Sequence, residues 1–197
     1  VDAEKGVESV QDAIDGAKDI LAEVYADDAD YRTKLRAMTK ESGSLVAKAK
    51  DEEADSVYEM YYDFSEPIKK LVGHRILAIN RGEAEKFLTV KIEAPRQEIL
   101  LWLVKQIIGN MKHDSASYLY EAITDSYDRL IAPSIEREIR NELTEKAEEG
   151  AIGVFGKNLH QLLMQPPISG QVVLGWDPGI PRLPPCLQNK SMRPPHP

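Results

Sequence analysis

Apolar residues recur at helical spacing along most of the chain, and this pattern predicts a mainly α protein. In residues 7–26 apolar positions repeat every three or four residues, and charged residues fall mostly between them, which is typical of an amphipathic helix. Either Asp27 or Asp28 can cap a second helix that Gly43 ends, because a short acidic side chain accepts free backbone N–H groups. The predicted inward positions of the first helix are Val7, Val10, Ile14, Ala17, Leu21 and Val24.

The middle of the chain mixes helical and extended patterns. Residues 44–50 favour a short strand, and residues 55–62 favour a helix that carries three tyrosines. A hydroxyl residue and a proline at 65–67 are typical of a helix start, so residues 68–87 are predicted to be helical. Residues 88–94 alternate and are β-branched, which predicts a strand, such as an isolated hairpin arm. This strand is the minor β element of the predicted fold.

The C-terminal half is predicted to be helical as far as about residue 164. Pro95 opens an apolar helix that ends near Gly109, and Asp114 or Ser115 caps the next one. Pro133 is expected to break or kink that helix, because proline lacks a backbone N–H and its ring crowds the preceding turn. The following helix spans about 30 residues, or roughly 45 Å, which favours a strut that connects one domain to the next.

These patterns give a predicted fold class and domain organisation. We expect a multi-helical bundle with a long connecting helix in residues 1–165, and the first strand of a truncated second domain in residues 166–179. Residues 180–197 hold six of the twelve prolines and show no period, so we expect a non-native or disordered tail. The chain is therefore expected to be a fragment of a larger protein.

Composition narrows the class of protein and its compartment. No apolar run approaches the roughly 18 residues of a membrane span, and we expect no signal peptide, because the first turn is acidic and carries no apolar stretch. The single cysteine, Cys186, cannot form an internal disulfide, which favours a reducing compartment. The net charge of −8 means that any nucleic-acid contact must rest on a local basic patch.

Signals for catalysis are weak, and we predict no enzyme activity, no cofactor and no metal. The four histidines lack metal-ligand spacing, and no nucleophile, phosphate-loop or zinc motif is found. Glutamates at 136–149 alternate with Arg137, Arg140 and Lys146, which predicts a solvated face with i,i+4 pairs. Asp177 follows an apolar strand and resembles the first carboxylate of RNase H-like folds, but one acid cannot hold the magnesium ions of that chemistry.

One basic stretch stands out in this acidic chain. Residues 68–96 carry seven Lys or Arg and three acids, a net charge of +4, against −12 for the rest. Such a patch can meet a phosphate backbone, or it can pair with acidic neighbours such as those at 51–55. Both alternatives stay open.

Four blocks of residues resemble the Tex family of bacterial transcription accessory proteins. They are 63–68 (DFSEPI), 74–83 (HRILAINRGE), 165–167 (QPP) and 173–179 (VLGWDPG), in matching order and spacing over roughly residues 6–179. The resemblance implies a helical N-terminal region followed by RNase H-like (YqgF-type), helix-hairpin-helix and OB-fold RNA-binding domains. Family members are cytoplasmic nucleic-acid-binding proteins. After 179 this chain departs from the family pattern, which removes any inference about the later domains.

The sequence thus leads to one function and two competitors. We predict a non-catalytic helical part of a nucleic-acid-binding (RNA or DNA) transcription factor, with no membrane contact. The competitors are a protein–protein docking scaffold for transcription machinery, with the long helix and Tyr58, Tyr61 and Tyr62 as its face, and a nuclease, which the missing acids disfavour. Arg75 and Arg81 could also tie helices together instead of binding a ligand. The candidate phosphate contacts are Lys70, His74, Arg75, Arg81 and Lys86.

Overall fold

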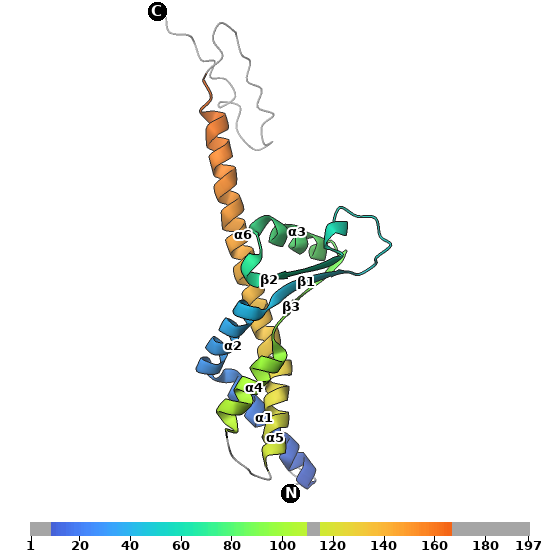
Figure 1. Cartoon of the computed structure of the whole chain (residues 1–197), viewed down its shortest axis with the longest axis vertical. Coiled ribbons are helices and arrows are strands. Elements are labelled where there is room, and N and C mark those ends of the chain that lie inside the picture. Colours follow the sequence, from blue (N-terminus) through green and yellow to red (C-terminus); the bar gives the residue numbers. More distant parts are fainter. Residues whose placement is uncertain (1–8, 110–114, 167–197) are drawn as a thin grey trace, which may run out of the picture. The chain divides into compact units, whose positions relative to one another are not determined.

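The computed structural model describes residues 9–109 and 115–166 (Figure 1). In this part of the chain, helices surround a small antiparallel sheet, which confirms the predicted mainly α class with a minor β element. The chain divides into two compact units, residues 1–158 and 159–197, and the sheet and the core lie in the first unit. The elements are α1 (Val10–Asp27), α2 (Ala29–Ser42), β1 (Ser44–Ala49), β2 (Asp63–Pro67), α3 (Gly73–Ala84), β3 (Leu88–Glu93), α4 (Arg96–Ile107), α5 (Ala116–Asp125) and α6 (Ala132–Leu163).

The first two helices begin and end at capping residues. At the start of α1, the hydroxyl of Ser9 accepts the backbone N–H of Asp12, and the Asp12 carboxylate accepts the N–H of Ser9. Of the two candidate caps for α2, Asp28 is the one used, because its carboxylate accepts the N–H of Tyr31 at 2.9 Å. Gly43 ends α2 as predicted.

The predicted inward face of α1 is only partly confirmed, since Ile14 and Leu21 are half-buried. Val10 and Val24 are 68% and 57% exposed, whereas the buried residues of this helix are Ala22 and Ala26. The Ser126 hydroxyl donates a hydrogen bond of 2.7 Å to the carbonyl of Ala22, and a small residue permits this close approach. Periodicity alone favoured the larger apolar side chains, but the contact requires small ones.

β1 is the central strand of a three-stranded antiparallel sheet. The strands predicted at 44–50 and 88–94 are confirmed, but the second is paired with β1 and is not an isolated hairpin arm. The predicted helix start at 65–67 is wrong, because these residues belong to β2 and pair with 44–46 of β1. Strand pairing between residues about 20 positions apart outweighs the local helix signal, and α3 begins only at Gly73.

The segment before β2 is also different from the prediction. Instead of a helix over 55–62 there is one 3-10 turn, Glu59–Tyr61. Tyr58 and Tyr61 are buried, at 5% and 7% exposure, and their rings pack on Phe87 and Phe64. They therefore belong to the core and are not part of a docking face.

Side chains of α6 cover the outer edge of β3. The Glu136 carboxylate accepts the backbone N–H of Ile92 at 2.9 Å, and the Arg140 guanidinium donates to the carbonyl of Val90 at 3.5 Å. These contacts occupy backbone groups that would otherwise invite another strand. The opposite edge, on β2, ends at Pro67, which has no N–H to offer.

Of the two alternatives predicted at Pro133, the break is wrong, because the chain remains helical from α5 into α6, and the kink stays a prediction. A π-helical turn, Ser126–Ile131, lies directly before the proline. Such a turn widens the helix, so the proline ring and its missing N–H are accommodated where the regular bonding pattern is already interrupted. α6 then runs to Leu163, which confirms the long helix ending near residue 164.

Two apolar clusters meet along the first half of α6. One joins α1, α2, α4, α5 and α6 and contains Ile99, Ile123 and Ile139, and the other lies between the sheet and α3 and contains Leu45 and Ile79. Leu143 packs against both clusters. Both the sheet with α3 and the remaining helices thus pack against a common helix.

Some predictions concern residues outside the described part of the chain. These are Val7 in the first helix, the cap at Asp114, the strand before Asp177 and the tail over 180–197.

Candidate nucleic-acid interface

The predicted phosphate contacts lie on α3 and on the residues that flank it. Lys70 precedes the helix, His74, Arg75 and Arg81 belong to it, and Lys86 follows its end. One side of α3 packs on the sheet and on α6 (Figure 1). The side chains of α3 therefore fall into two groups, those that hold the fold together and those that the fold leaves available for a ligand.

A polar network ties α3 to α6. The Asn80 amide donates to the Thr144 hydroxyl at 2.8 Å and accepts from the Arg140 guanidinium at 3.4 Å. Arg140 also forms an ion pair with Glu83, which is one turn further along α3. Asn80 and Glu83 thus act inside the protein, although both belong to the block that resembles the Tex family.

Two glycines let α3 approach its neighbours closely. A Cβ at Gly82 would lie 2.7 Å from a Leu88 side-chain carbon and 3.1 Å from the Tyr58 ring. A Cβ at Gly73 would lie 3.3 Å from the Cα of Ala147 on α6. These positions are therefore used for packing.

Arg75 is already paired within the protein. Its guanidinium donates to both carboxylate oxygens of Glu66 on β2, at 3.0 and 2.9 Å, and the Glu66 side chain is only 20% exposed. This geometry matches the alternative in which Arg75 ties elements of the fold together. Its assignment as a phosphate contact stays a prediction.

The other candidates point into solvent. Lys70, His74, Arg81 and Lys86 are exposed, and none forms an ion pair with another described residue. His74 and Arg81 are seven residues apart, so they share one face of α3 and are separated by roughly 10 Å along its axis. Of the remaining cations in the basic stretch, Lys69 pairs with Glu41 and Arg96 with Asp128, whereas Lys91 is exposed on β3.

Lys86 has an unusual backbone conformation. Its φ angle of +68° lies in the left-handed region, where glycine is favoured because it has no Cβ. The position ends α3: the Lys86 N–H donates to the Glu83 carbonyl at 3.0 Å, and the Phe87 N–H donates to the Gly82 carbonyl at 2.9 Å. A lysine thus occupies a position at which glycine would fit with less strain.

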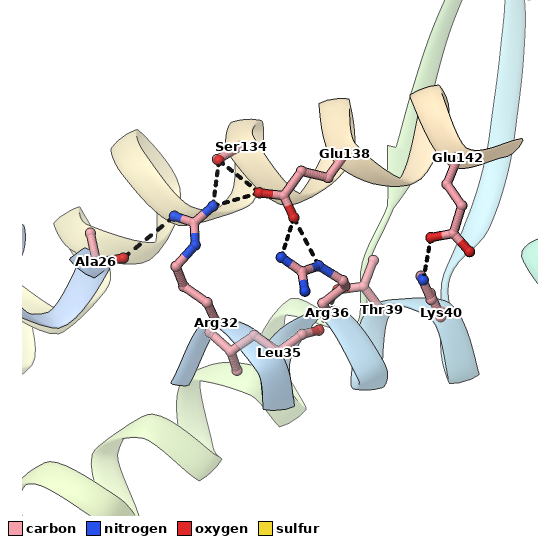
Figure 2. Close-up of polar contacts among 9 residues, drawn as sticks. All are labelled: Ala26, Arg32, Leu35, Arg36, Thr39, Lys40, Ser134, Glu138 and Glu142. Atoms are coloured by element: carbon pink, nitrogen blue, oxygen red, sulfur yellow. Dashed lines mark hydrogen bonds and ion pairs between the residues drawn. The ribbon is translucent and has the colours of Figure 1, made fainter. Parts of the chain in front are cut away.

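Only half of the α6 glutamates lie on the solvated face that was predicted: Glu145, Glu148 and Glu149 are exposed, whereas Glu136, Glu138 and Glu142 are partly buried. Figure 2 shows Glu138 between Arg32 and Arg36 of α2, with a 2.7 Å ion pair to Arg32, and Glu142 paired with Lys40. Only Glu142 with Lys146 is an i,i+4 pair of the predicted kind. Charges that were expected to face solvent instead join two helices.

The ion pairs of Glu138 and Glu142 with α2 form a ladder between the two helices. The pKa values of both carboxylates in this ladder are lowered. Burial raises the pKa of Glu138, but hydrogen bonds from Arg36 and Arg32 outweigh it and hold the pKa below its ordinary value. Hydrogen bonds from Lys146 and Lys40 lower the pKa of Glu142 to about 2. Both carboxylates are therefore ionised at neutral pH.

A groove lies beside the N-terminal end of α3. It has a volume of about 630 Å³, and Leu77, Ala147, Val154 and Phe155 give it apolar walls, with His74 at its rim. No cluster of metal-ligating residues occurs among the described residues. Nor is any helix in the described ranges long and apolar enough to cross a membrane.

Comparison with known proteins identifies the family. The model of the Tex central region-like family matches residues 1–155. The chain belongs to the Tex family. Among its relatives are the uncharacterized protein YdcI of Bacillus subtilis (49% identical, 91% of this chain and 26% of the relative) and the transcriptional accessory protein Tex of Neisseria gonorrhoeae (31%, 85% and 23%).

A human relative carries an RNA-related name. The S1 RNA-binding domain-containing protein 1 of Homo sapiens is 34% identical over 89% of this chain and 19% of its own length. The Tex-family chain therefore spans about a fifth to a quarter of these relatives. Their names describe proteins four to five times as long as the matched region.

The sequence pointed to the block 74–83, but it did not reveal that residues of this block stabilise the fold by bonding to α6. Asn80 and Glu83 were not singled out, and their partners Arg140 and Thr144 lie about 60 residues away. The sequence did contain a signal for this role. Asn80 and Glu83 are polar residues on the inner side of a helix, and buried polar groups require hydrogen-bonding partners. Within this block, Arg81 is the charged residue without an ion pair among the described residues.

Proposed function

We propose that this region is a non-catalytic, nucleic-acid-associated part of a transcription accessory protein. The observation that supports the proposal most directly is that some cations around α3 are paired with carboxylates and others are exposed without a pair among the described residues. The fold neutralises Lys69, Arg75 and Arg96 with carboxylates, and it leaves Lys70, Arg81 and Lys86 exposed. The names of the Tex and S1-domain relatives agree with a role of this kind. The proposed location is the cytoplasm.

Binding through so few charges is expected to be weak and sensitive to salt. Each phosphate that a lysine or arginine neutralises releases counterions, so affinity falls as salt rises. The test is fluorescence anisotropy of the chain with labelled RNA and DNA, single- and double-stranded, at about 50 and 200 mM salt. Salt-sensitive binding is expected, and no binding at about 50 mM salt would contradict the proposal.

The site assignment needs charge reversals with a matched control. R81E/K86E should weaken binding, whereas K34E/K105E should leave most of it, because Lys34 and Lys105 are also exposed but lie on α2 and α4. Both variants change the net charge by the same amount. Equal losses would show that binding follows net charge alone and would contradict this site. Thermal melts establish that each variant is folded.

A second candidate function is a docking scaffold for other proteins. It is favoured by Ile152, Val154 and Phe155 of α6, which are 69%, 60% and 66% exposed. Contiguous exposed apolar surface on a helix is typical of interaction sites. This function predicts capture of partners that survives nuclease treatment and is lost in V154D/F155D.

A further inference from the structure

The loop that joins β1 to β2 is anchored at both ends beside the C-terminal end of α3. At its start, the Lys50 N–H donates to the carbonyl of Phe87 at 2.9 Å. At its end, the Tyr58 ring packs on Phe87, with ring centres 5.8 Å apart, and against Gly82. Figure 1 shows this loop and the end of α3 at the same end of the sheet. The loop therefore begins and ends next to residues 82–87, which adjoin Arg81 and include Lys86.

This loop carries four carboxylates that form no ion pair within the described part of the chain. They are Asp51, Glu52, Glu53 and Asp55, and all four are exposed. The residues that flank them, Lys50 and Tyr58, contact Phe87, which directly follows Lys86. Burial and a hydrogen bond to Glu85 raise the pKa of Tyr58, and the charge of Arg81 opposes this rise.

Hydrogen bonds fix the shape of the loop. The Asp51 carboxylate accepts the N–H of Glu53 at 3.1 Å, and the Ser56 hydroxyl accepts the N–H of Tyr58 at 3.1 Å. The Tyr62 hydroxyl donates to the carbonyl of Ala54. These bonds order the backbone of the loop, so its ordering is not an added entropic cost when the loop acts on a neighbouring charge.

We propose that this acidic loop, residues 51–55, competes with nucleic-acid phosphates for Arg81 and Lys86. The inference rests on the function proposed above, because it concerns the regulation of the same surface. A carboxylate attracts a cation and repels an incoming phosphate over distances up to a Debye length, roughly 10 Å at 0.1 M salt. The loop weakens binding to every polyanion, and it excludes those of low charge density first.

Neutralising the loop provides the test. D51N/E52Q/E53Q/D55N removes four charges, and Asn at 51 can still accept the Glu53 N–H. The variant should bind a fluorescein-labelled single-stranded RNA about three to ten times more tightly at about 50 mM salt. The gain should shrink at about 200 mM salt.

A matched control separates the position of the charges from their number. A second variant neutralises four exposed acids of α1, α2 and α4 and should gain less than about twofold. Its substitutions are E23Q, D27N, D30N and E98Q. Equal gains in the two variants would overturn the proposal while leaving the proposed function intact.

The cations provide a further criterion. In an R81Q/K86Q background, neutralising the loop should give no more than the control, because the competing pair is gone. A full gain in that background would overturn the proposal. If neither the wild type nor any variant binds RNA at about 50 mM salt, the proposed function fails together with its regulation.

Discussion

The two halves of α6 have the same helical backbone but different surroundings. In residues 132–147, Ile135, Ile139 and Ala147 are buried, and Glu138 and Arg140 are bonded to α2 and α3. In residues 148–158 every side chain is exposed. A regular apolar stripe continues through both halves, so periodicity identifies the helix but does not establish which part of it is covered.

α3 repeats this contrast between its two sides. On the inner side, Asn80 and Glu83 are bonded to α6, and Gly82 is packed against Leu88. On the outer side, His74 and Arg81 are exposed. A side chain that stabilises the fold should respond to substitution through stability, and one that the fold leaves free should respond through binding.

The largest expected difference lies between two isoleucines of α6. Ile139→Ala should lower the free energy of unfolding by about 3 kcal/mol, because it opens a cavity around a side chain that is 1% exposed. Ile152→Ala, the same change at 69% exposure, should alter it by less than about 0.5 kcal/mol. Urea unfolding of both variants measures the difference. Similar losses would mean that residues 148–158 are also packed in solution.

The next effect concerns charge. Glu138→Gln removes the carboxylate shared by Arg32 and Arg36, and these partly buried guanidiniums lose their common acceptor. We expect a loss of about 1.5 kcal/mol in unfolding free energy. Glu145→Gln, at an exposed position of the same helix, should change it by less than about 0.5 kcal/mol. Equal stabilities of the two variants would show that the ladder contributes nothing.

A pH titration tests the same ladder. The pKa of Glu142 is about 2 in the folded protein and higher in the unfolded chain, so its contribution is complete above about pH 5. As the pH falls from 5 toward 2 the carboxylate is protonated and the contribution is lost. Because the side chain is 38% exposed, solvent screening reduces this contribution to about 1 kcal/mol.

The comparison for this titration is between Glu142→Gln and Glu145→Gln. Unfolding free energies from pH 7 to 2 should fall less steeply for Glu142→Gln, since the group that titrates is gone. Glu145→Gln should follow the wild-type curve, because Glu145 is exposed and forms no ion pair with a described residue. Parallel curves for all three proteins would contradict the lowered pKa of Glu142.

Local signals predicted those elements that local interactions decide. The Asp28 cap, the Gly43 end of α2 and the strand β3 follow from residues close in sequence, and the structure confirms them. The residues 65–67 have an equally good helix-start signal but lie in β2, because their partners are in β1. Some acids of α6 were misjudged for the same reason, since Arg32 and Arg36 lie about 100 residues away.

The sequence predicted where the candidate site lies, but not which of its cations are paired within the fold. The block 74–83 and the excess of positive charge marked α3 from sequence alone. That Arg75 is paired with Glu66, whereas Arg81 has no such pair among the described residues, depends on how β2 and α3 lie together. Charge counting cannot separate these two arginines, because the separation is a property of tertiary contacts.

The smallest expected effect concerns Lys86. Here one substitution should raise the stability of the fold and weaken the binding of nucleic acid. Lys86→Gly should raise the unfolding free energy by about 0.5 kcal/mol, because glycine adopts the φ angle of +68° without a Cβ clash. Lys86→Ala keeps the Cβ and should not stabilise. Both variants lose the charge, so both should bind nucleic acid less tightly than the wild type. Thermal melts and anisotropy of the two variants measure both properties. If Lys86→Gly stabilises the fold and binding is unchanged, the lysine is no part of the interface.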